Sequence, residues 1–158
     1  MPLKAANSLN KGRAILTFAL AYIAVTILGI ALSLSISAIG HIPQTAEPMQ
    51  NAAYLLSERF LPIMNLLVWM LFSWMYFQKR PRISTSHRQA FFLGAFWLLV
   101  ALVVDYVGFV LIKNPISLSP HDFYIGQFPW IYLIYIAVLI SPLCYVALSD
   151  ARQKKDLA

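Results

Sequence analysis

Residues 90–112, AFFLGAFWLLVALVVDYVGFVLI, form a long apolar run that contains a single charged side chain, Asp105. The hydrocarbon core of a bilayer is about 30 Å thick, which roughly 20 helical residues can cross. Every backbone polar group in such a segment must be satisfied internally, and a helix achieves this. The run therefore predicts a transmembrane helix, and the rest of the chain must fold around it.

Three further runs have the same character, and none of them contains a charged residue: 14–39, 60–77 and 128–148. The chain is 60% hydrophobic and 11% charged, whereas soluble proteins are about half apolar and a quarter charged. The sequence predicts an all-α polytopic membrane protein. Residues 1–158 form a single membrane domain of four transmembrane helices in an up-down bundle. A signal peptide is the alternative for 14–39, but that apolar stretch exceeds the usual 7–15 residues or so, and a retained helix is expected.

The basic residues indicate an orientation. The N-terminal arm, the 78–89 loop and the 149–158 tail carry three, four and three Lys or Arg residues, whereas the other side has only Arg59 and Lys113. Because cytoplasmic loops are enriched in basic residues, both termini are expected in the cytoplasm. The net charge of +6 is then explained by orientation and anionic lipid headgroups. The lipid bilayer is the expected partner, and nucleic acid is not.

Asp105 is the main candidate for chemistry. A carboxylate inside a span costs about 2.5–3.5 kcal/mol on insertion scales and is a functional-site hypothesis by default. Gly94, Ala101 and Gly108 recur every seven residues, and Asp105 lies four residues after Ala101. Residues at this spacing share a helix face, and small residues let helices approach closely in lipid. Asp105 is therefore expected to face the interior of the bundle.

Counting residues inward from the outer end of each span predicts a layer of polar side chains about 10 Å from that end. The layer is made of Ser33, Asn65, Asp105 and Tyr135. Arg59, at the outer end of the second span, has a side chain long enough to reach Asp105 and pair with it. Two interpretations stay open. Asp105 is either a structural carboxylate satisfied by neighbouring hydroxyls, amides or Arg59, or a group with a proton-transfer, ion-binding or catalytic role.

The outer loops hold a second set of titratable residues: His41, Glu47, Glu58, His121 and Asp122. Together with Asp105, His121 and Asp122 are the candidates for catalysis, while His41 and His121 are weak candidates for a metal site, because imidazole and carboxylate suit zinc. Their spacing matches no metal-binding signature such as HExxH. Solvated loop groups are therefore the preferred interpretation, and no cofactor is expected.

The segment 121–130, HDFYIGQFPW, resembles the stretch before the last helix of lipoprotein signal peptidases. Those enzymes use two aspartates, in Asn-x-x-Asp-Arg and Phe-Asn-x-Ala-Asp motifs. Here Tyr106 follows Asp105 and IYLIYIA follows Trp130, so both motifs are missing and the activity is not expected. The entry to the last helix, QFPWIYLIY, is similar to that of uncharacterised small four-helix bacterial membrane proteins. This resemblance implies a bacterial plasma membrane but no function.

Three functions from different classes follow. The preferred one is a non-enzymatic accessory protein that binds a membrane-protein partner or a second copy of itself. The second is a small oligomeric transporter or proton-coupled carrier that uses Asp105. The third is an outer-leaflet enzyme acting on a lipid or a lipid-anchored substrate. The sequence has no Walker loop, GxSxG, CxxC or dinucleotide fingerprint, which disfavours nucleotide chemistry and thiol exchange.

Overall fold

The computed structural model describes residues 9–43, 45, 48–78, 86–112 and 117–156, and within these the fold is all-α. The elements, in chain order, are α1 (Lys11–Gly40), the 3₁₀ turn η1 (Pro48–Gln50), α2 (Ala52–Glu58), α3 (Leu61–Phe77), α4 (His87–Asp105), the π-helical segments η3 (Tyr106–Leu111) and η4 (Asp122–Gly126), and α5 (Trp130–Asp156).

Three helices begin with a side-chain cap. Asn10, Asn51 and Ser86 have extended backbones and accept hydrogen bonds from the first free backbone N–H groups of α1, α2 and α4. Such caps satisfy donors that a helix cannot satisfy internally. At the other end of α1, His41 follows Gly40 in the left-handed conformation (φ 50°), and its N–H donates to the carbonyl of Ser37.

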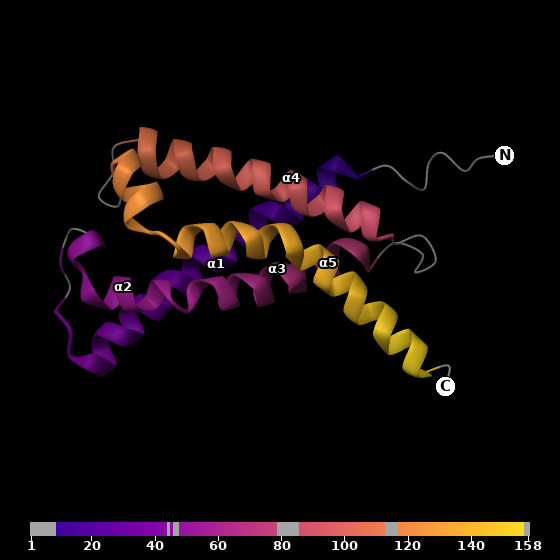
Figure 1. Cartoon of the computed structure of the whole chain (residues 1–158), viewed down its shortest axis with the longest axis horizontal. Coiled ribbons are helices and arrows are strands. Elements are labelled where there is room, and N and C mark those ends of the chain that lie inside the picture. Colours follow the sequence, from indigo (N-terminus) through magenta and orange to yellow (C-terminus); the bar gives the residue numbers. More distant parts are fainter. Residues whose placement is uncertain (1–8, 44, 46–47, 79–85, 113–116, 157–158) are drawn as a thin grey trace.

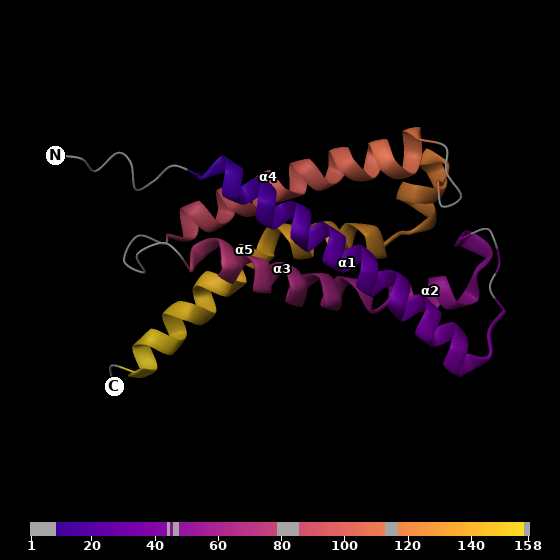
Figure 2. The same cartoon turned by 180° about the vertical axis from the view of Figure 1, so that it is seen from behind.

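The four long helices run alternately back and forth, so that both ends of the described chain lie at the same end of the molecule (Figures 1 and 2). We call this the termini end, and the end that carries α2, η3 and η4 the opposite end. Three helical segments are each long and apolar enough to cross a membrane: Lys11–Gly40, His87–Leu111 and Trp130–Gln153. The shorter α3 qualifies together with α2, to which it is bent by 54°. Helices of this kind are typical of an integral membrane protein.

The fourth predicted span extends further than expected. α5 contains Pro142 and continues to Asp156, eight residues beyond the predicted end of this span at residue 148. Proline has no N–H for the carbonyl four residues earlier, which is that of Val138. The hydroxyl of Ser141 donates to this carbonyl at 3.1 Å. A neighbouring serine thus satisfies the acceptor that Pro142 leaves free, as is common in membrane helices.

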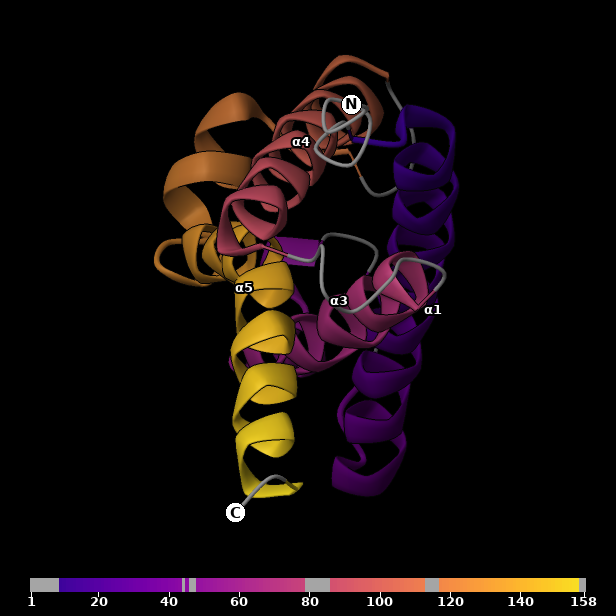
Figure 3. The ribbon, with the colours of Figure 1, turned by 90° about the vertical axis from the view of Figure 1, so that its right-hand side faces the viewer.

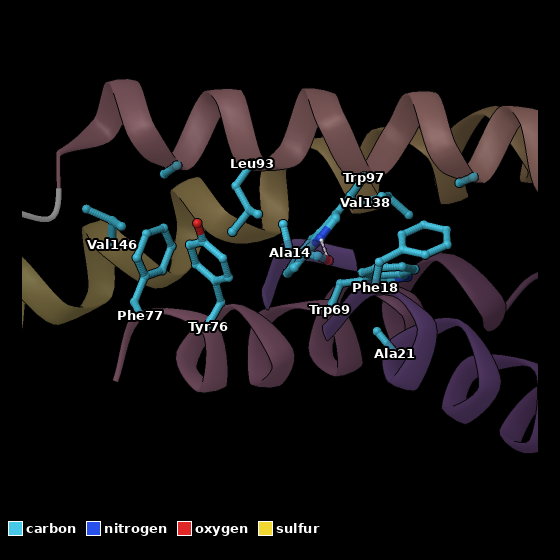
Figure 4. Close-up of a cluster of buried hydrophobic side chains, with 12 residues drawn as sticks. Ala14, Phe18, Ala21, Trp69, Tyr76, Phe77, Leu93, Trp97, Val138 and Val146 are labelled. Carbon is cyan, nitrogen blue, oxygen red and sulfur yellow. Dashed lines mark hydrogen bonds between the residues drawn. The ribbon is translucent and has the colours of Figure 1, made fainter. Parts of the chain in front are cut away.

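The main apolar core extends from the termini end to the middle of the molecule (Figure 4). Trp69 of α3 lies between Phe18 of α1 and Trp97 of α4, with ring centroids 5.4 and 5.2 Å away. The indole Nε1 of Trp97 donates to the carbonyl of Ala14 at 2.9 Å. Three helices are therefore joined through two buried indoles.

Close contact between α4 and α5 depends on Gly94. A Cβ atom at this position would lie 2.1 Å from the carbonyl oxygen of Leu139, whereas one at Gly108 would meet nothing within 4 Å. Ala101 is also buried. The seven-residue pattern of small residues therefore marks a packed face up to Asp105 and fails after it. There α4 passes into the wider π-helical turn of η3, which changes the angular spacing of side chains.

Candidate functional site

A cavity of about 420 Å³ lies in the opposite-end half of the molecule. Its walls come from the second half of α1, from α2, from the first turns of α3 and α5, and from the region where α4 passes into η3. Viewed down the long axis, α3 lies between α1 and α5 (Figure 3). The described lining is mostly apolar and aromatic, with polar groups at a few points.

Asp105 is the last residue of α4 and is 9% exposed. Each of its carboxylate oxygens accepts a hydrogen bond from a tyrosine of another helix. Tyr22 of α1 donates to Oδ1 at 2.5 Å, and Tyr135 of α5 donates to Oδ2 at 2.9 Å. A buried carboxylate needs such donors, because leaving a polar group unsatisfied in an apolar environment is costly. Asp105 therefore links α1, α4 and α5 at the wall of the cavity.

All four residues of the predicted polar layer line this cavity: Ser33, Asn65, Asp105 and Tyr135. Their hydrogen bonds differ, however. Asn65 donates to the carbonyl of Leu61 at 2.9 Å and accepts from the Nε1 of Trp69 at 3.1 Å. The amide of Asn65 thus bonds within its own helix, whereas Tyr135 bonds to Asp105.

Tyr22 is a partner of Asp105 that the sequence reasoning missed. Residue counting from the outer end placed Ser33 at the same height as Asp105. The residue of α1 that bonds to Asp105 is instead Tyr22, which lies 11 positions before Ser33, roughly 16 Å along a helix axis. Equal counts correspond to equal heights only for helices of similar length and tilt. α1 has 30 residues, whereas α4 has 19, and it crosses the others at a slope (Figure 2). A tyrosine inside an otherwise apolar span is the signal that identifies Tyr22.

A second carboxylate, Glu58, lines the same cavity from the end of α2 and is 4% exposed. It shares a hydrogen bond with Tyr54 one turn earlier. The Nε2 of Gln127 donates to the Tyr54 hydroxyl at 2.6 Å. The short helix α2 is thereby joined to the chain that precedes α5. Sequence reasoning placed Glu58 among the solvated loop groups, because nothing in the sequence indicates that α2 lines a cavity.

The other predicted site residues lie elsewhere. The ion pairs among described residues are His87 with Asp150 and His121 with Asp122, so Arg59, which is exposed, does not pair with Asp105. His41 and His121 are exposed.

Asp122 bonds to Ser119 through both its side chain and its N–H. His41, His121 and Asp122 are not among the described residues that line the cavity. Among the described residues, no three His, Cys, Asp or Glu side chains lie close enough together to hold a metal ion. Glu47 falls outside them.

Comparisons with known proteins place the chain in no family: no family matches the sequence, and neither a curated protein nor a solved structure matches it. The site must therefore be interpreted from its own geometry.

Proposed function

We propose that this protein is a membrane-embedded binding protein that takes a small amphiphilic molecule into the cavity at the opposite end and acts as a carrier for it. The observation that carries the proposal is the position of Asp105. The carboxylate most costly to place in a membrane lies on the wall of a cavity of about 420 Å³, within the size range of small-molecule sites, about 300–1,000 Å³. The lining is mostly apolar with a small number of polar groups, and such a lining suits an amphiphile.

The proposal includes a location. The protein would lie in a bacterial plasma membrane with both termini in the cytoplasm and the cavity toward the outer face. The distribution of basic residues supports this, since ten of the twelve belong to the three segments assigned to the cytoplasm. A bundle this small is thin-walled for a transport path, so carriage would involve a homo-oligomer.

A cavity-filling variant tests the proposal. Ser33 of α1 lines the cavity, whereas Ser35 is exposed and bonds to the carbonyl of Ala31. Wild type, Ser33→Phe and Ser35→Phe are purified in mild detergent and compared by native mass spectrometry. We expect a bound small molecule on wild type and on Ser35→Phe that is lost from folded Ser33→Phe. Identical spectra for all three proteins would contradict the proposal.

One observation favours the accessory role as a second candidate. α1 exposes a line of large apolar residues along most of its length: Ile15, Leu16, Ile23, Ile27, Ile30 and Leu34. Lipid or the helix of another membrane protein would cover such a face equally well. A stoichiometric protein that copurifies with wild type and is lost when Ile23 and Ile27 are replaced by tryptophan would establish this role.

A further inference from the structure

We infer that the molecule bound in this cavity is a lipophilic cation, such as an amphiphile with an amine or quaternary ammonium head. The inference rests on the proposed function, because it specifies the ligand of the same cavity. Three features of the described lining carry it: the sign of its charge, its aromatic surface, and its contrast with the rest of the protein.

The only formal charge that the described lining residues can carry is negative. Asp105 and Glu58 approach the cavity from different helices, and the described lining residues include no Lys, Arg or His. Arg59 follows Glu58 directly in sequence, yet it is exposed and absent from that lining. Two carboxyl groups therefore share one cavity, and their hydrogen-bond partners are tyrosine hydroxyls. A bound cation would supply the opposite charge that buried carboxylates otherwise lack.

Aromatic rings form a substantial part of the lining. Trp69, Phe109, Phe123 and Trp130 line the cavity together with three tyrosines. The faces of aromatic rings attract cations, and Trp attracts them most strongly, with quaternary ammonium groups as the best-known ligands. A neutral apolar ligand would pack against the rings and would not need the carboxylates. An anionic ligand would be repelled by the carboxylates.

The negative lining contrasts with the net charge of the chain. The protein carries +6 overall, and among the described residues Lys11, Arg13 and Arg88 belong to the helix ends at the termini end. The carboxyl groups of the cavity therefore lie at the end of the molecule where the described part of the chain is poor in basic side chains. Low-dielectric walls strengthen the attraction between an ionised carboxylate and a bound cation.

A matched pair of probes tests the inference. Tetraphenylphosphonium and tetraphenylborate have nearly the same size and shape and opposite charge. Equilibrium binding of each is measured on the full-length protein in detergent, with empty micelles and Ser33→Phe as references. We expect tetraphenylphosphonium to bind wild type at least tenfold more tightly than tetraphenylborate. Equal or tighter binding of tetraphenylborate would overturn the inference.

Substitutions identify the groups that select the charge. Asp105→Asn and Glu58→Gln each remove one carboxylate with little change in shape, and each should weaken phosphonium binding at least fivefold. The variant with both changes should lose the preference for the cation while its thermal unfolding stays cooperative. Unchanged phosphonium affinity in the double variant would also overturn the inference.

The outcomes separate this inference from the proposed function. If tetraphenylborate binds as well as the cation and Ser33→Phe prevents both from binding, the cavity is a binding site and only the charge assignment fails. If the phosphonium binds without sensitivity to Ser33→Phe, the site is not this cavity, and both claims fail. If neither probe binds to wild type, the cationic class is wrong, and the native mass spectra decide whether the cavity holds another ligand.

Discussion

The two ends of this molecule are built from the same four long helices, yet one end is densely packed and the other contains an open cavity. At the termini end, Gly94 lets α4 approach the backbone of α5, and two buried indoles fill the space among α1, α3 and α4. At the opposite end, α2, η3 and η4 line a cavity with Asp105 in its wall. Dense packing thus holds the helices together where no ligand is expected and leaves the other end open for one.

The largest effect is expected at Gly94. Replacing it by alanine would place a Cβ atom 2.1 Å from the Leu139 carbonyl oxygen, and since this oxygen is backbone, the helices must separate. Overpacking costs typically about 1–3 kcal/mol, and we expect at least the upper value here, seen as a lower midpoint of thermal unfolding in detergent. Gly108→Ala is the control, because nothing lies near its Cβ. Equal effects of the two changes would show that the two ends are packed alike.

Trp97 tests the packed end further. Trp97→Phe removes a fully buried indole and its hydrogen bond to Ala14, which should cost about 2 kcal/mol because the smaller ring leaves a cavity in the core and one hydrogen bond is lost. Trp74→Phe is the matched change on a half-exposed indole and should stay within about 0.5 kcal/mol of wild type. Denaturant titration of both variants, followed by fluorescence, measures the difference. A Trp74 effect as large as that of Trp97 would contradict the assignment of the core.

Tyr135 tests the wall of the cavity. Tyr135→Phe removes one of the two hydroxyl donors to Asp105 and should cost about 1.5 kcal/mol, as expected for a hydrogen bond to a charged group. Tyr132→Phe is the control on the same helix, where the ring is exposed. Unfolding midpoints measured side by side give the comparison. No loss in Tyr135→Phe would mean that Asp105 does not depend on this hydroxyl.

The smallest effect is expected at His41, the left-handed residue that ends α1. Glycine adopts φ 50° without the steric penalty that other residues pay. His41→Gly should therefore raise stability by up to about 1 kcal/mol, and His41→Val should lower it by a similar amount. Thermal unfolding of the pair checks both signs. A loss of stability in His41→Gly would show that the imidazole itself contributes.

The sequence predicted much of the fold for a simple reason. Each apolar run has to satisfy its own backbone if it crosses a bilayer, so run length and charge locate the helices to within a few residues, as α3 and the continuous pair α4 and η3 show. The same logic singled out Asp105, and residue counting grouped it with Ser33, Asn65 and Tyr135, of which Tyr135 bonds to it. The sequence predicted that Gly94 lies on a face of small residues, but it did not predict that this face contacts Leu139.

Other features had no signal in the sequence. The pairing of Tyr22 with Asp105 depends on the slope of α1, which residue counts do not contain. The approach of Glu58 to the cavity depends on how the connection between α1 and α3 folds back, and the π-helical turn of η3 depends on tertiary packing. Arg59 was expected to reach Asp105 because its side chain is long enough, but length alone does not determine direction.

The most direct measurement of the central claim is photolabelling of the wild-type protein with an azide-bearing triphenylphosphonium, followed by peptide mass spectrometry. A cation-binding cavity at the opposite end predicts adducts within residues 22–34 and 130–138. Excess tetraphenylphosphonium should abolish them, and they should be absent from Ser33→Phe. Adducts spread over the lipid-exposed faces of the helices, or concentrated at the termini end, and unaffected by Ser33→Phe, would contradict the claim.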